Sequence, residues 1–126
     1  MIVFLGGSYA HFPKKVIVSI YMNFEINILI VEDLLTTRLF LRRTLKKLGY
    51  FNVVLAEDGR AALEELKRKS FDLIISDWHM PNMDGLDLFK ELTKDPKLRD
   101  IPFLLITAEK EREKVVEAVA AGIKEY

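Results

Sequence analysis

The chain has 126 residues, enough for one domain and too few for two. Basic and acidic residues balance at 19 each, so the basic excess that marks a nucleic-acid-binding protein is missing. Cysteine is absent and only two histidines occur, which excludes disulfides and thiolate sites and argues against a multi-histidine metal site. No apolar run reaches membrane-spanning length, and we expect a cytoplasmic protein.

Residues 1–21 differ from the regular pattern that follows them. Two apolar runs, at 1–5 and 16–21, are separated by Gly6-Gly7 and Pro13-Lys14-Lys15. The lysines follow the first apolar run rather than precede it, so a signal peptide is not indicated. Two interpretations stay open: an added strand or hairpin, or translation from upstream of a start at Met22. We favour the second, because the organised pattern begins just after Met22.

From there, apolar runs alternate with helical patterns. Buried strands are predicted over residues 26–31, 53–55, 72–75 and 103–106. This alternation predicts an α/β domain, a doubly wound parallel sheet covered by helices on both faces. We take residues 22–126 as this domain and 1–21 as an amino-terminal extension.

Four helices are predicted between and after these strands. In the first, Leu41, Leu45 and Leu48 recur at helical spacing, and Gly49 ends the helix. Its basic residues, among them Arg38, are interpreted as a solvated face. Asp58 and Asp84 are predicted to cap the second and third helices, and Asp95-Pro96 to end the third. The fourth carries Val115, Val116 and Val119 and ends at Gly122.

Polar residues stand where three of the strands end: Glu32-Asp33, Asp77 and Thr107. Parallel strands point the same way, and in the common order 2-1-3-4 the first and third strands are neighbours, so these groups converge at one edge. Clustered carboxylates raise each other's pKa unless a cation compensates them, and an all-oxygen site suits Mg²⁺. Asp77 could then attack a phosphoryl group, with Thr107 donating its hydroxyl. For Asp77 alone, a simple role as a turn-capping aspartate is equally open.

The pattern from Met22 onward resembles the response-regulator receiver domain, and within that family the single-domain chemotaxis regulator that docks on the flagellar switch. The matching motifs are Ile28-Leu29-Ile30-Val31-Glu32-Asp33, Asp58-Gly59, Ser76-Asp77-Trp78-His79-Met80-Pro81-Asn82-Met83-Asp84-Gly85 and Thr107-Ala108-Glu109. The resemblance implies a flavodoxin-like fold, and two-component signalling rather than enzymatic turnover, apart from self-dephosphorylation.

The resemblance also implies roles for individual residues. Asp77 would accept phosphate from a histidine kinase, with Mg²⁺ held by Asp33, Asp77 and the backbone carbonyl of His79, and by Glu32 through water. Thr107 would contact the phosphoryl group and relay the switch. Arg112, Val115 and Tyr126 would belong to the partner surface, although Arg112 and Val115 are equally well ordinary helix residues. A flagellar switch protein and a phosphatase are the other implied partners, with no direct role for nucleic acid or membrane.

Two departures from the family pattern stand out. His79 replaces an asparagine usual in the chemotaxis members, which puts the dephosphorylation rate in question. The family also continues past the position of Tyr126 into a fifth strand, a Lys-Pro pair and a fifth helix, which this sequence does not contain. Without that phosphate-contacting lysine, we expect phosphate acceptance to be more robust than the response to it. The fourth strand is then expected to be an exposed edge, with residues 16–21 as a candidate substitute strand.

Other functions stay open beside this one. The chain could be the receiver of a longer regulator with a DNA-binding or enzymatic output. A Mg²⁺-dependent phosphohydrolase working through an aspartyl-phosphate is disfavoured, because enzymes of the haloacid-dehalogenase type carry Asp-x-Asp after the first strand. Here that strand ends in Glu32-Asp33. For a degenerate receiver that only binds proteins, the intact acidic residues argue against and the missing lysine argues in favour.

Overall fold

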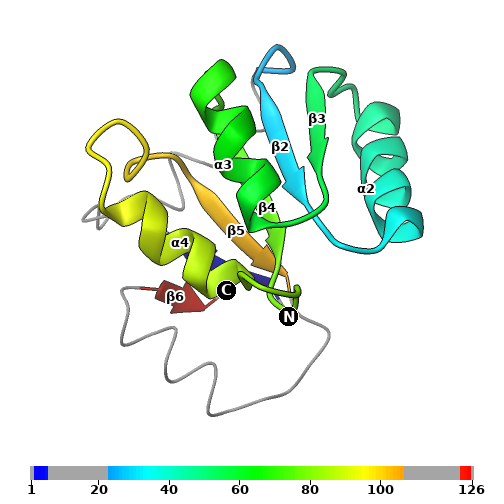
Figure 1. Cartoon of the computed structure of the whole chain (residues 1–126). Coiled ribbons are helices and arrows are strands. Elements are labelled where there is room, and N and C mark those ends of the chain that lie inside the picture. The colour runs from blue at the N-terminus through cyan, green and yellow to red at the C-terminus, as the bar shows by residue number, and fades with distance from the viewer. Residues whose placement is uncertain (1, 6–22, 107–122, 126) are drawn as a thin grey trace.

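The computed structural model describes residues 2–5, 23–106 and 123–125. Within them, six strands form one sheet in the order β3-β2-β4-β5-β1-β6 (Figure 1). Thr107, Arg112, Val115 and Tyr126, the predicted fourth helix and the 16–21 segment lie outside the described residues. Of the helices described, none has the length and apolar character needed to cross a membrane.

Four of the strands are parallel and form the predicted α/β sheet. They are β2 (Ile28–Val31), β3 (Val53–Ala56), β4 (Leu73–Asp77) and β5 (Phe103–Ile106). Strand β2 pairs with both β3 and β4, and β4 pairs with β5. The predicted order 2-1-3-4 is therefore confirmed, and the ends of β2 and β4 lie side by side.

Helices cover both faces of this parallel part, which explains why its strands are almost continuously apolar. Alternate residues of β2 face opposite sides, because side chains alternate along a strand. Leu29 and Val31 pack in the cluster that contains α3 (Gly59–Arg68) and α4 (Gly85–Thr93). Ile28 and Ile30 pack on the other face, against α2 (Leu35–Lys47).

Helix α2 lies less deeply on the sheet than the other two. None of its residues is fully buried; Leu41 and Leu45 are partly buried against the sheet. Leu48, the third leucine at helical spacing, lies beyond the last helical residue and is 59% exposed. Gly49 follows with φ +103°, a left-handed conformation that glycine adopts without steric cost, so the predicted stop is confirmed.

Helices α3 and α4 begin at the predicted capping residues. The Asp58 carboxylate accepts a hydrogen bond from Ala61 N at 2.8 Å. The Asp84 carboxylate accepts one from Asp87 N, also at 2.8 Å, and the Asp87 carboxylate in turn accepts one from the Asp84 backbone N–H. This reciprocal capping box anchors α4 directly after the loop that follows Asp77.

The outer part of the sheet differs from the prediction. The edge of β5 was expected to be exposed or covered by residues 16–21, but β1 (Ile2–Leu5) pairs with it, antiparallel, from Ile2↔Ile106 to Leu5↔Phe103. A further short strand, β6 (Ile123–Glu125), pairs antiparallel with the far side of β1. The expectation failed because strand pairing is open to any segment that supplies backbone N–H and C=O groups, whatever its distance along the chain.

Candidate functional site

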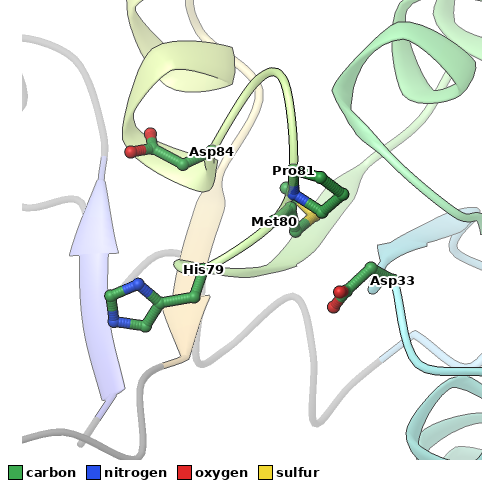
Figure 2. A pocket seen from close by; sticks show the side chains of 5 residues that line it. All are labelled: Asp33, His79, Met80, Pro81 and Asp84. Atoms are coloured by element: carbon green, nitrogen blue, oxygen red, sulfur yellow. The ribbon is translucent and has the colours of Figure 1, made fainter.

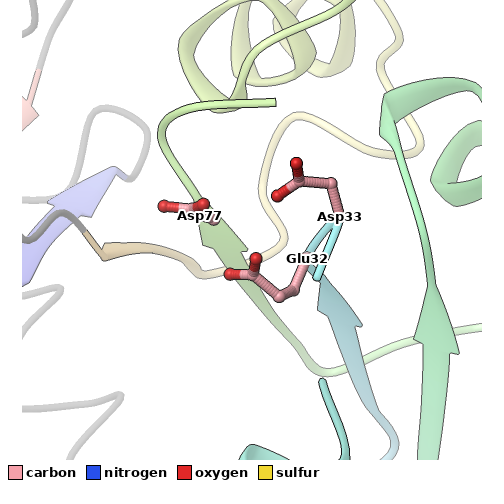
Figure 3. A group of neighbouring side chains, drawn as sticks. All are labelled: Glu32, Asp33 and Asp77. Carbon is pink, nitrogen blue, oxygen red and sulfur yellow. The ribbon is translucent and has the colours of Figure 1, made fainter. Parts of the chain in front are cut away.

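Three carboxylates meet at the carboxyl ends of two neighbouring strands. Glu32 and Asp33 follow β2, and Asp77 is the last residue of β4. Val31 pairs with Ser76, so the next residue of each strand leaves the sheet at the same level. One carboxylate oxygen from each of the three acids lies within 4.8 Å of the others. Figure 3 shows the three side chains gathered at this edge of the sheet. The predicted convergence of these three residues is thus present in the fold.

Burial makes this cluster electrostatically costly. Glu32 is only 5% exposed. Its burial raises its pKa to about 7, helped by the nearby charge of Asp77 and opposed by the Leu34 N–H. Burial likewise raises the pKa of Asp77, while the neighbouring backbone N–H groups of His79 and Trp78 act in the opposite direction and lower it. A cation placed among the three would relieve the cost of ionising them.

The loop after Asp77 folds back sharply to begin α4. Trp78 N donates to Ile106 O at 3.0 Å, which extends the pairing with β5 by one residue, and Gly85 N donates to Trp78 O at 2.9 Å. Asn82 adopts φ +70°, a left-handed conformation that asparagine tolerates better than most residues. The Trp78 ring is 2% exposed and belongs to the core, so it fixes the loop beside Asp77.

Gly85 is required by this close return of the chain. A Cβ on Gly85 would collide with the backbone carbonyl oxygen of Asp77 and would lie 2.5 Å from Leu105 Cδ1. The Asp77 oxygen is also held by the Ser76 hydroxyl, which donates to it at 2.9 Å. The first turn of α4 therefore packs directly on the backbone of Asp77, and only glycine leaves room for it.

An open pocket of about 330 Å³ adjoins the carboxylates and is lined by Asp33, His79, Met80, Pro81 and Asp84. In Figure 2 the His79 ring points away from Asp33, so the backbone of this loop, rather than the imidazole, is the part nearer that carboxylate. The pocket is of a size that holds small ligands. Clustered carboxylate oxygens beside it fit a hard dication such as Mg²⁺, which prefers few protein ligands and keeps room for water and phosphate oxygens.

Two residues of this region make contacts that the sequence pattern does not predict. Asp84 was predicted only as a helix cap, yet it also lines the pocket. Arg38 was grouped with a solvated basic face, but it is half-buried and its guanidinium donates to the backbone oxygens of Glu32, at 2.7 Å, and Asp33, at 3.1 Å. An arginine five to six residues after an acidic pair was the available signal.

Comparison with known proteins agrees with this geometry. Residues 28–126 match the model of the response regulator receiver domain. The chain belongs to the response regulator receiver domain family. The chemotaxis protein CheY-3 of Vibrio cholerae serotype O1 is 43% identical to it over 105 residues, which cover 83% of this chain and 81% of that protein.

Solved structures give the same result for the fold of this receiver domain. The chemotaxis response regulator CheY4 of Vibrio cholerae superposes with a TM-score of 0.70 at 36% identity, covering 78% of this chain and 81% of that one. The receiver domain of a sensor histidine kinase from Pseudomonas aeruginosa has a TM-score of 0.69 at 28% identity, with coverage of 78% and 80%. That structure has a magnesium ion coordinated in its active-site cleft.

Proposed function

We propose that this receiver domain accepts a phosphoryl group on Asp77 from a histidine kinase, with Mg²⁺ as cofactor. The observation that carries the proposal is the meeting of Glu32, Asp33 and Asp77 within 4.8 Å beside an open pocket. Asp33, Asp77 and the backbone carbonyl of His79 would hold the metal, and Glu32 would act through a water molecule. Bound Mg²⁺ would supply positive charge to the phosphoryl oxygens as the group transfers.

The residues of the chain would contribute positioning and charge control. A carboxylate oxygen of Asp77 attacks phosphorus, and the bond from phosphorus to the donor nitrogen breaks, leaving the electron pair on the imidazole. The backbone N–H groups of Trp78 and His79 favour the ionised form of Asp77 that this attack needs. The buried Trp78 ring and the close packing of Gly85 keep the Asp77 backbone in place. Thr107 would contact the transferred group and relay the change.

The output that we propose is control of chemotaxis through a flagellar switch protein, in the cytoplasm. Its support is the 43% identity to a chemotaxis protein over most of both chains. Arg112, Val115 and Tyr126 would form part of the partner surface, and a phosphatase would reverse the signal. A second candidate is the receiver of a longer signalling protein, favoured by the likeness to receiver domains of histidine kinases. Binding of the phosphorylated chain to a purified flagellar switch protein would distinguish the two.

Incubation with acetyl phosphate and Mg²⁺, followed by intact-mass measurement, tests the proposal. We expect one acid-stable, base-labile phosphoryl adduct on the parent chain and none on Asp77→Asn. Asp100→Asn is the matched control, because Asp100 is exposed and lies away from the site. Absence of the adduct from the parent chain, or its persistence in Asp77→Asn, would refute the proposal.

A further inference from the structure

The half-buried Arg38 side chain connects helix α2 to the backbone of the acidic pair. Its Nη1 atom donates to Glu32 O at 2.7 Å and to Asp33 O at 3.1 Å. Within the described part of the chain, the bonds recorded for this guanidinium go to these backbone oxygens and not to a carboxylate. Arg38 therefore fixes the peptide units that carry two of the three acids without forming an ion pair with them.

The loop between β2 and α2 has few other restraints. Helix α2 begins after Leu34, a residue whose side chain cannot cap a helix, and its first turn contains no acidic residue. The Leu34 N–H instead donates to Glu32 Oε1 at 3.1 Å, so part of the capping is done by a member of the acidic cluster itself. Among the described residues, the two bonds from Arg38 Nη1 are the other side-chain hydrogen bonds to the backbone of this turn, and they reach both acidic residues at once.

We propose that Arg38 is a positioning residue for the metal site, holding the Glu32 and Asp33 backbone so that their carboxylates converge with Asp77. The inference rests on the proposed magnesium site. Partners that orient metal ligands from behind typically change metal affinity by about 10- to 100-fold when they are removed. Arg38 fits that description, since it touches the ligands' backbone and not the place where the ion would bind.

Positioning and charge predict opposite results for Arg38, which makes the inference decidable. The guanidinium is a positive charge close to a cation site, so by Coulomb's law its removal alone would strengthen Mg²⁺ binding. If Arg38 instead holds the two peptide units in place, its removal weakens Mg²⁺ binding even though the repulsion between the guanidinium and the ion is lost. A simple loss of global stability would change the melting temperature and leave the affinity of the folded chain unaltered.

The test is a Mg²⁺ titration of the full chain by calorimetry and by fluorescence of Trp78, which is buried next to Asp77. We expect the Kd of Arg38→Ala to rise about tenfold, and Arg38→Lys, which keeps the charge but places its donor group on a different side-chain shape, to lie between that variant and the parent. Arg43→Ala is the matched control: the same charge is lost from an exposed position on the same helix. Its Kd should stay the same or fall.

Each outcome is decisive. A Kd for Arg38→Ala that is unchanged or lower than that of the parent overturns the inference, since charge rather than positioning would then govern binding. If Arg38→Ala does not fold, as judged by circular dichroism, Arg38→Gln is measured by the same criterion. A parent chain that shows no Mg²⁺ binding would refute the proposed function and, with it, this inference. A parent that binds Mg²⁺ beside an unaffected Arg38→Ala refutes the inference alone.

Discussion

The parallel and antiparallel parts of the sheet are held together in different ways. In the parallel part, β3-β2-β4-β5, helices lie over both faces and bury both sets of alternating side chains. In the antiparallel part, β1 and β6 come from opposite ends of the chain and join the sheet through strand pairing. All three clustered acids stand on the parallel part.

The way the parallel strands are connected explains why the site lies at their carboxyl ends. In a strand–helix–strand unit the strand direction is fixed by the crossover, so successive strands end at the same edge and their polar residues converge. An antiparallel strand at the border of the sheet contributes backbone pairing. Its connection does not require it to place a polar residue at that edge. We therefore expect changes in the parallel part to affect both stability and metal binding, and changes in β1 to affect stability and association alone.

The largest effect is expected from Gly85→Ala. The new Cβ would meet the backbone oxygen of Asp77, which cannot move without shifting the site, so we expect a loss of about 3 kcal/mol in unfolding free energy. Gly59→Ala is a matched control, because Gly59 likewise opens a helix after an aspartate cap. There the Cβ meets the flexible Met83 thioether at 2.6 Å, and the cost should stay below about 1 kcal/mol. Urea denaturation measures both, and equal costs would contradict the packing argument.

The next largest effect is a dependence of stability on pH through Glu32. Its pKa is raised from 4.5 to about 7 in the folded chain, so between these values the folded state keeps a proton that the unfolded state has released. Stability from this group is therefore full below about pH 4.5 and is lost as the pH rises through about 7. Glu32→Gln keeps the neutral form, and we expect it to be more stable than the parent at pH 8, in the presence of a chelator, by on the order of 2 kcal/mol.

The Glu32 prediction has its own control in Glu57→Gln, an exposed position on the segment after β3. Chemical denaturation at pH 4 and at pH 8 is the measurement. The parent and Glu32→Gln should differ at pH 8 and coincide at pH 4, while Glu57→Gln should follow the parent at both values. If Glu32→Gln were less stable than the parent at pH 8, the negative charge of the buried Glu32 carboxylate would already be stabilised by its surroundings.

An effect of similar size is expected when the antiparallel part is removed. Replacing residues 2–5 by a Gly-Ser segment of equal length removes the pairing with β5, at a cost of about 2 kcal/mol for a few ladder hydrogen bonds. The freed edge of β5 should then support concentration-dependent association. Light scattering after size exclusion and a Mg²⁺ titration are the measurements. A change in Mg²⁺ affinity would show that the antiparallel part is coupled to the metal site.

The smallest effect is expected from the helix caps. Asp58→Ala and Asp84→Ala each remove a side-chain bond to the helix backbone at 2.8 Å, and each should cost about 1 kcal/mol. Only Asp84 lines the pocket, and burial raises its pKa, so only Asp84→Ala should also alter Mg²⁺ affinity. Urea denaturation and the same titration separate the two effects. An equal change in affinity for both variants would mean that helix fraying, not the pocket, is responsible.

Much of the parallel part followed from the sequence by itself. Continuous apolar runs indicated strands buried on both faces, aspartates at 58 and 84 indicated helix starts, and polar residues after three strands indicated a common edge. These features are local, since each depends on the side chains of a few neighbouring residues and on the fixed direction of strand–helix–strand units. The meeting of Glu32, Asp33 and Asp77 followed from the same rule.

Other features were decided only by the tertiary structure. The pairing of β1 with β5 joins residues 2–5 to residues 103–106. It is made by backbone hydrogen bonds, which depend little on side-chain identity, so the sequence pattern does not predict which strands pair. The bond from Arg38 to the Glu32 carbonyl depends on the conformation of the turn before α2. The positions of charged residues in the sequence do not predict that conformation. The sequence thus determined which groups reach the edge of the sheet, whereas the folded backbone decided what holds them there.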